Sequence, residues 1–244
     1  MTLQQQILSP QLPVQLRIHS EQALLLDFSA LVPDGPGPAL MQLMQHLRTQ
    51  LPLLLGDALL ELIPSYTSLL VVFDVLKTDH QEIWQKIRAA QAELFRPDAS
   101  SSGTKVIELP CYYSVESGPD LQQVAALHQL RVSELIELHS QRAYQVYAIG
   151  FAPGFAYLGF TDARINTPRL TTPRPQVAAG SVGIADRQTA VYPAASPGGW
   201  HLLGNCPTPL FDLHATPMMP FAVGDTVRFV PIERAEFLRL GGQL

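Results

Sequence analysis

The sequence is poor in the residues that mark several large classes of protein. Charged residues make up only 15% of its 244 residues, and lysine is confined to Lys77, Lys86 and Lys105. The net charge of -5 argues against a nucleic-acid surface, because neutralising phosphates requires clustered lysine and arginine. The two cysteines, Cys111 and Cys206, form no CxxC pair. They cannot build a disulfide framework.

Signals for membrane insertion, export and nucleotide or metal binding are also missing. The longest apolar runs, such as LPLLLGDALL, are shorter than a membrane span, and MTLQQQILSPQLP at the N-terminus has no basic and apolar regions of a signal peptide. We therefore expect a cytoplasmic protein without a membrane partner. No lysine directly follows a glycine, so there is no P-loop, and no GxGxxG opens a helix. Scattered histidines without HExxH or Cys/His ligand spacing predict no metal site.

What the sequence does contain is a hydrophobic fraction of 47%, enough for one large core or two small ones. Up to residue 95, strand-like runs and amphipathic helices follow the order ββαββα, with Asp79 as the expected N-cap of the second helix. This order predicts an α+β domain, residues 1–95, in which helices pack on one face of an antiparallel sheet. The expected strands are 14–20, 23–29, 58–66 and 68–74, and the expected helices are 38–51 and 79–95.

A break in composition follows at RPDASSSGT, residues 96–104, which we interpret as an interdomain linker. In residues 105–244 a strand and two helices precede short β-prone runs that glycine and proline separate, as in a barrel or sandwich. This half is therefore predicted to be a mainly β domain. The expected strands are 105–110, 143–150, 181–185, 189–192, 199–204, 209–214 and 225–231, and the expected helices are 120–130 and 132–140.

The segment YAIGFAPGFAYLGF, residues 147–160, has two interpretations. It is either a hairpin whose aromatic side chains join the core, or a rigid loop with an aromatic wall for a small ligand. The residue spacing leaves both open. On the second interpretation, the wall consists of Phe151, Pro153, Gly154, Phe155 and Tyr157.

The segment TPRLTTPRPQV, residues 167–177, places Arg169 and Arg174 on a proline-stiffened stretch with no acidic residue nearby in the sequence. A guanidinium group binds two oxygens of a carboxylate or phosphate at once. Both arginines are therefore candidates for anion recognition. The alternative is ordinary surface charge.

The segment GSVGIADRQTAVYPAASPGGW runs from Gly180 to Trp200. Its GSVG is not the GxSxG of a serine hydrolase, so that class is disfavoured. The Gln-Thr pair can exchange hydrogen bonds with a ligand, and consecutive glycines can offer backbone N–H groups to an anion. Turns alone explain the glycines but not the polar pairs, so a binding site is favoured, with no catalytic residue assigned. Its candidates are Ser181, Gln188, Thr189, Ser196, Gly198, Gly199 and Trp200.

Taken together, CYY…GPDL, YAIGFAPGFAYLGF, PR…TPR…AGSVGIADRQTAVYP and SPGGWHLLG resemble the 5-oxoprolinase B-subunit family, also called KipI or allophanate hydrolase subunit 1. The resemblance is dense over residues 105–231 and weaker before them. It implies a cyclophilin-like barrel after the α+β domain. Asn205 and Cys206 replace a basic residue and threonine of the family, which leaves the arginines, Gln188 and the SPGGW loop as the better candidates.

The resemblance implies a component of a bacterial ATP-dependent 5-oxoprolinase complex, which opens the lactam of 5-oxo-L-proline (pyroglutamate) to L-glutamate. Its implied partners are the A and C subunits, with ATP as a cosubstrate bound by this chain or by a companion. We expect little activity from the single chain. One alternative is a KipI-like regulator that inhibits a sensor histidine kinase. Another, half of a biotin-dependent urea or amide carboxyltransferase, is disfavoured because no biotinyl-lysine motif is present.

Overall fold

The computed structural model describes residues 14–33, 35–95 and 105–244. The chain divides into two compact units, Met1–Gly103 and Thr104–Leu244. The segment interpreted as a linker, residues 96–104, lies outside the described residues, so the domain boundaries stay a prediction.

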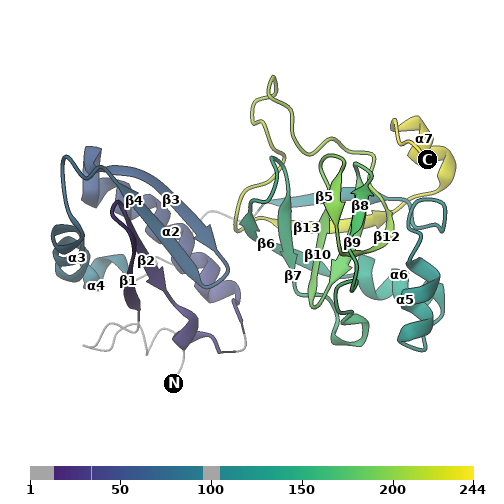
Figure 1. The fold of residues 1–244 in the computed structure, drawn as a ribbon, viewed down its shortest axis with the longest axis horizontal. Helices are drawn as coiled ribbons and strands as arrows, with labels where there is room; N and C mark the ends of the chain where they lie inside the picture. Colours follow the sequence, from purple (N-terminus) through teal and green to yellow (C-terminus); the bar gives the residue numbers. More distant parts are fainter. Residues whose placement is uncertain (1–13, 34, 96–104) are drawn as a thin grey trace. The chain divides into compact units, whose positions relative to one another are not determined.

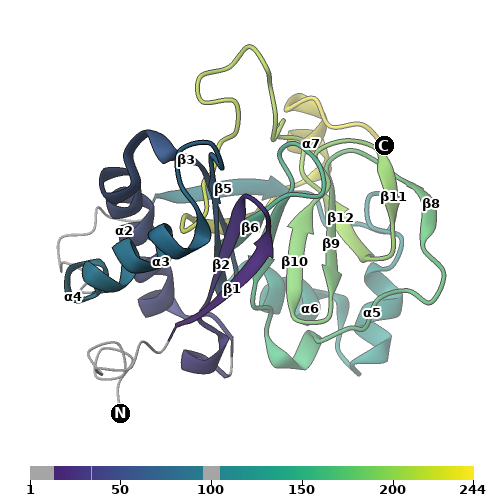
Figure 2. The same cartoon turned by 60° about the vertical axis from the view of Figure 1, so that its left-hand side comes forward.

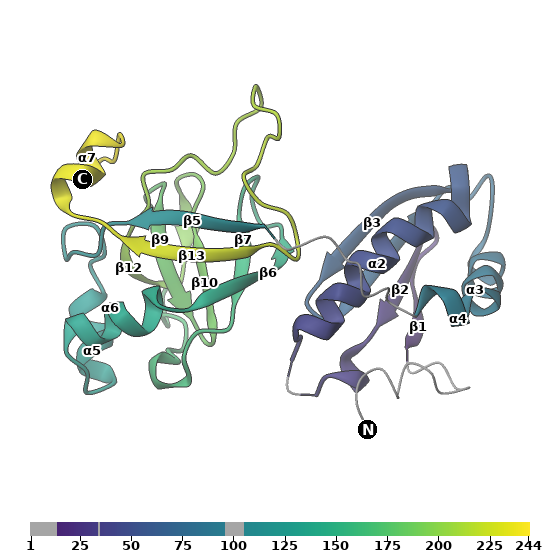
Figure 3. The ribbon, with the colours of Figure 1, turned by 180° about the vertical axis from the view of Figure 1, so that it is seen from behind.

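The first unit is a four-stranded antiparallel sheet in the order β1-β2-β4-β3, and α2 runs across one of its faces (Figure 3). The order of elements follows the expected ββαββα, except that Ala90 interrupts the second helix. The strands are β1 (Gln15–Ser20), β2 (Ala23–Asp27), β3 (Leu59–Ser65) and β4 (Ser68–Phe73). The helices are α2 (Pro38–Leu55), α3 (His80–Ala89) and α4 (Gln91–Leu94), with 3-10 turns at Ser29–Leu31 and Gly56–Ala58.

Periodic burial explains these elements. Along β4, buried side chains alternate with partly exposed ones, which is the pattern of a strand with one covered face. Helix α2 buries residues spaced three and four apart and continues past its expected end, because Leu51 and Leu55 extend the buried stripe. The expected cap of α3 is confirmed: the Glu82 backbone N–H donates to the Asp79 carboxylate at 2.8 Å.

The second unit is built on a seven-stranded sheet in the order β12-β9-β10-β7-β6-β13-β5 (Figure 1). At the ends of the two edge strands, Asn205 of β12 and Tyr112, which follows β5, exchange backbone hydrogen bonds of 2.9 and 3.0 Å, so the sheet is nearly closed. The β-rich prediction is confirmed at this level; the closer likeness to cyclophilin stays a prediction. The strands are β5 (Val106–Cys111), β6 (Ala143–Ile149), β7 (Ala156–Gly159), β9 (Ser181–Ala185), β10 (Gln188–Val191), β12 (His201–Asn205) and β13 (Thr226–Pro231).

The interior of the nearly closed sheet is filled by apolar side chains such as Tyr144, Leu158 and Phe229, each at most 2% exposed. The sheet is antiparallel except for β5 and β13, which run parallel and side by side (Figure 3). The helices are α5 (Leu121–Leu127), α6 (Val132–Ser140) and α7 (Arg234–Arg239), with a 3-10 turn at Ala163–Ile165.

Several local features differ from the sequence-based expectation, among them helix α7, which was not expected. The expected strand 209–214 is wrong: these residues form part of the long connection between β12 and β13 (Figure 1). Asp212 turns the chain there, because its carboxylate accepts from the His214 backbone N–H at 2.8 Å. A two-stranded ribbon of β8 (Arg174–Val177) and β11 (Ser196–Gly198), visible beside the main sheet in Figure 2, was not expected. None of the helices in the described residues is long and apolar enough to cross a membrane.

Candidate functional site

Four segments of the chain meet around a cavity of about 190 Å³ in the second unit. They are the loop and strand around β7, the residues that precede β8, the residue that follows β10, and β11 with the residues that follow it. Much of the predicted site is therefore brought together. The predicted residues that line the cavity are Phe151, Phe155, Tyr157, Arg169, Gly198, Gly199 and Trp200.

Phe155 is the centre of the aromatic wall. Its ring lies 4.9 Å from that of Tyr157, 5.1 Å from that of Phe151 and 5.9 Å from that of Trp200, centroid to centroid. Phe155 is 2% exposed, whereas Phe151 is 64% exposed. The two interpretations of this segment thus describe different residues of one hairpin: Phe155 belongs to the core, and Phe151 stands at the solvent side of the cavity.

The two glycines of SPGGW differ in their surroundings. A Cβ at Gly198 would collide with the hydroxyl of Tyr192, so this position needs glycine to let the backbone approach the phenol. A Cβ at Gly199 would make only an ordinary contact, 3.7 Å from Pro173. The Gly199 carbonyl accepts from the Leu170 backbone N–H at 2.8 Å, which ties the arginine segment to this loop.

Both arginines have an acidic neighbour in space, although none is near them in the sequence. Arg174 donates to the Asp120 carboxylate at 2.6 Å and to the Trp200 carbonyl at 3.2 Å. Arg169 approaches Asp186 only at 3.9 Å, and both of these side chains are mostly exposed. An exposed pair at that distance contributes little. Arg174 is therefore committed to the protein, whereas Arg169 keeps its guanidinium group available at the cavity.

The remaining candidates do not line the cavity. Thr189 is fully buried, and its hydroxyl donates to the Gly183 carbonyl at 3.0 Å. Gly154 has a positive φ of 82°, and a Cβ there would lie 2.7 Å from the Leu210 carbonyl oxygen, so it serves a tight turn. The others are Ser181, which is 2% exposed within β9, Gln188, which begins β10, Ser196 in β11, and Pro153.

Tyr192 is a lining residue that the sequence analysis missed. Burial raises the pKa of Tyr192, while the Trp200 backbone N–H and the guanidinium groups of both arginines act in the opposite direction. The phenol therefore stays protonated near neutral pH and can donate a hydrogen bond. A tyrosine directly after an apolar strand was the available signal, because a buried phenol usually places its hydroxyl at a polar boundary.

Among the described residues that line the cavity, Arg169 is the charged one. Around it stand aromatic rings, prolines and the backbone of two glycines. This combination suits a small, flat, partly apolar molecule with one anionic group. Nowhere in the described residues do three or more His, Cys, Asp or Glu side chains gather so that they could hold a metal ion.

Comparisons with known proteins show first which domain model the chain matches and then which protein family it belongs to. The chain matches the model of the carboxyltransferase domain, subdomain C and D, over residues 14–221. It is 38% identical over 188 residues to the B subunit of 5-oxoprolinase from Bacillus subtilis (strain 168), which covers 73% of this chain and 78% of the relative. It is 42% identical over 161 residues to the protein of that name from Haemophilus influenzae, covering 66% and 74%. The chain therefore belongs to the 5-oxoprolinase B-subunit family, as its motifs predicted.

Solved structures agree on the fold. The protein TTHA0988 superposes with a TM-score of 0.74 at 29% identity over 88% of this chain; the chain spans 40% of that protein's length. A conserved uncharacterized protein, PH0987 from Pyrococcus horikoshii, is 39% identical with a TM-score of 0.53, over 91% of this chain and all of the other. Kluyveromyces lactis urea carboxylase gives a TM-score of 0.70 at 16% identity, over 93% of this chain and 22% of its own. The last likeness concerns the fold alone.

Proposed function

We propose that this chain is one component of an ATP-dependent 5-oxoprolinase and that the cavity beside Arg169 binds 5-oxo-L-proline. The family supports the activity, since its curated relatives are named as components of a 5-oxoprolinase. The observation that supports the site is the placement of one available guanidinium group at the edge of a small aromatic cavity.

The chemistry of the substrate matches this lining. 5-Oxoproline is a compact lactam ring with one carboxylate. The ring would pack on Phe155, Tyr157 and Trp200, and the carboxylate would accept from the guanidinium group of Arg169. A cavity of about 190 Å³ is smaller than the roughly 300–1,000 Å³ of drug-sized pockets, in keeping with so small a ligand.

The requirement for ATP follows from the reaction. An unstrained lactam is a poor electrophile, so phosphorylation of its oxygen makes an activated species that water can open to glutamate. The charge that develops must be stabilised by positioned cations and N–H donors. A cavity with a single guanidinium group is poorly equipped for a triphosphate as well. We therefore assign the substrate to this chain and ATP to a companion, the A or the C subunit.

The experiment uses the complex assembled from this chain and its companion subunits. Arg169→Lys and Arg169→Ala should raise the KM for 5-oxoproline about tenfold or more, because one charge-assisted hydrogen bond contributes roughly 1.5–3 kcal/mol. The lysine variant should not restore binding, because it lacks the bidentate fork. Arg164→Ala is the matched control: Arg164 is also exposed and paired with an aspartate, but does not line the cavity. Parent-like KM values for both Arg169 variants would place the substrate elsewhere.

A further inference from the structure

Asp120, at the start of α5, is a buried carboxylate that contacts β12 and Arg174. It is 4% exposed, and one of its oxygens accepts from the Leu202 backbone N–H at 2.7 Å. The other oxygen accepts from Arg174 at 2.6 Å. The Asp120 backbone N–H also donates to the Leu202 carbonyl at 3.1 Å. Both carboxylate oxygens are thus satisfied by donors, as a buried charge requires.

Gly118, two residues before Asp120, allows Asp120 to lie this close to β12. A Cβ at Gly118 would collide with the backbone of Leu203 and Gly204, so only glycine lets the turn before α5 lie directly on β12. The GPD sequence therefore has a clear physical basis: the glycine permits the approach, and Asp120 then binds the strand.

Arg174 connects Asp120 to a residue that lines the cavity. Its second nitrogen donates to the Trp200 carbonyl at 3.2 Å, and its backbone lies opposite Gly198 in the ribbon of β8 and β11. Trp200 and Gly198 both line the cavity, but Asp120 and Arg174 do not. One guanidinium group thus joins the start of α5, the ribbon and the backbone of Trp200.

We infer that Asp120 is a positioning residue, which holds Trp200 and the β8–β11 ribbon in place through Arg174 and the Leu202 N–H and so preforms the wall of the cavity. Asp120 sets the affinity for substrate without touching it. The part of this inference that concerns substrate rests on the proposed function; the part that concerns Trp200 does not. A preformed site binds more tightly because less ordering accompanies binding.

Two variants test this role. In Asp120→Asn the amide group must turn its NH2 toward either Leu202 N–H or Arg174, both of which are donors, so one contact is lost. Arg174→Lys keeps the charge and leaves the Leu202 contact intact, but a single ammonium group cannot hold Asp120 and Trp200 in the same fork geometry. The matched control is Asp162→Asn, because Asp162 also accepts from an arginine side chain and a backbone N–H but lies outside the cavity lining.

The first readout is acrylamide quenching of Trp200 fluorescence, made specific by Trp84→Phe because the chain has two tryptophans. Trp200 is 5% exposed, so both variants should show several-fold stronger quenching and the control should not. Parent-like quenching in both variants overturns the inference, whatever their melting temperatures. A lower melting temperature alone would mean that the pair is only a scaffold.

The second readout is the kinetics of the assembled complex. We expect KM for 5-oxoproline to rise about tenfold in both variants while kcat changes less, since the loss of one charge-assisted contact weakens the wall rather than the chemistry. Stronger quenching with an unchanged KM would support the positioning of Trp200 but overturn the assignment of the cavity to substrate. Trp200 quenching therefore tests the positioning role of Asp120, and the KM for 5-oxoproline tests the proposed substrate site.

Discussion

His139 is a histidine whose protonation state the surrounding residues dictate. It lies fully buried in α6, with Nδ1 2.7 Å from the hydroxyl of Tyr113 and Nε2 2.8 Å from that of Thr189. Thr189 gives its single proton to the Gly183 carbonyl, so Nε2 of the histidine carries a proton. Burial disfavours a second proton on the ring, so Nδ1 accepts from the Tyr113 hydroxyl. The ring is thus neutral and hydrogen-bonded on both sides. Thr189, a candidate for substrate binding, instead completes this chain of hydrogen bonds.

Burial lowers the pKa of His139 from 6.5 to about 3. Between these values the unfolded chain binds a proton that the folded protein does not, so acid favours unfolding. We expect the free energy of unfolding to fall by up to about 1.4 kcal/mol for each pH unit below 6.5, until other groups dominate near pH 4. Urea denaturation at pH 7.5, 6.5, 5.5 and 4.5 measures this slope.

His139→Gln is the control for that measurement. It should be less stable than the parent at pH 7.5, because the hydrogen bonds of the ring are disturbed, but it has no imidazole to take up a proton in the unfolded state. Burial also lowers the pKa of His128, which contributes a slope of the same sign in both proteins. The difference between the two slopes therefore belongs to His139. Equal slopes would show that His139 is protonated in the folded protein.

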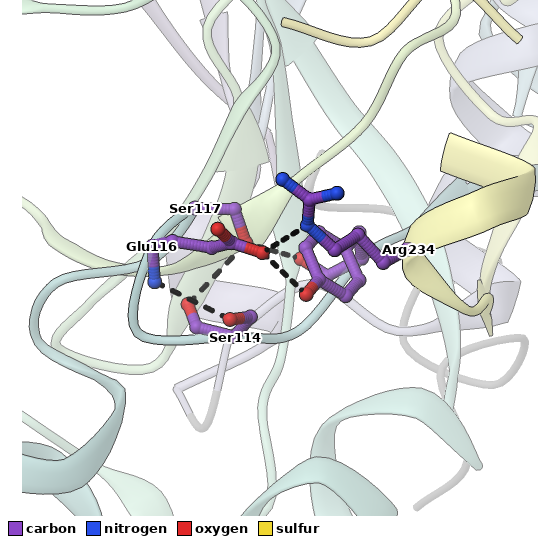
Figure 4. A network of polar contacts seen from close by, with 5 residues as sticks. Ser114, Glu116, Ser117 and Arg234 are labelled. Atoms are coloured by element: carbon purple, nitrogen blue, oxygen red, sulfur yellow. Dashed lines mark hydrogen bonds and ion pairs between the residues drawn. The ribbon is translucent and has the colours of Figure 1, made fainter. Parts of the chain in front are cut away.

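At the scale of elements, the short helix α7 is held against the barrel by one buried ring and a surface network. Phe237 is fully buried, and its ring lies 5.3 Å from that of Tyr112. In the surface network, one carboxylate oxygen of Glu116 accepts from the Tyr112 hydroxyl at 2.7 Å and from Arg234 at 2.9 Å (Figure 4). The network is exposed, so we assign most of the stabilisation to the buried ring.

Phe237→Ala should therefore lower the free energy of unfolding by about 3–5 kcal/mol, the usual cost of deleting a buried aromatic side chain. Leu238→Ala is the matched control on the same helix: Leu238 is 44% exposed, and its loss should change stability by at most about 0.5 kcal/mol. Thermal or urea unfolding of the two variants checks this. Similar small changes in both would mean that α7 adds little to the stability of the second unit.

Elements with a regular hydrophobic pattern could be predicted from the sequence. Helix α2 has an apolar residue every three or four positions, and Asp79 caps α3 through a purely local hydrogen bond. The ribbon of β8 and β11 could not be predicted, because each strand is short, contains proline and exists through pairing with the other, about twenty residues away in sequence. The predicted strand at residues 209–214 was wrong for the opposite reason. The local sequence favours a strand, but the turn at Asp212 prevents one.

The candidate site also contains features that the sequence suggested and features that only the folded structure reveals. The aromatic and glycine-rich segments offered Phe151, Phe155 and Trp200 as candidates, with a plain hairpin left open for the first two, and all three line the cavity. The sequence could not reveal that Arg174 is paired, since its partner Asp120 lies 54 positions away. Nor could it show which polar residues of a strand point inward, because one residue of register decides that.

At the scale of the whole molecule, the cavity accounts for binding better than for catalysis. The described residues lining it include one guanidinium group and two tyrosine side chains, but no carboxylate or histidine that could act as a general base. Lactam opening needs an activated phosphate, a water molecule and a group that removes its proton. On the proposed function, we therefore expect the companion subunits to supply the missing groups.

We predict that the purified chain releases no glutamate from 5-oxoproline and ATP, and that activity appears only when the A and C subunits are added. The chain alone should still bind 5-oxoproline, because Arg169 and the aromatic wall belong to it. Quenching of Trp200 in the Trp84→Phe protein would report this binding, and Arg169→Ala should weaken it about tenfold or more. Glutamate release is measured with a coupled dehydrogenase assay on the chain, on the companions and on the mixture. Full turnover by the single chain would contradict its assignment as one component of a complex, whereas binding by the companions but not by this chain would move the substrate site to them.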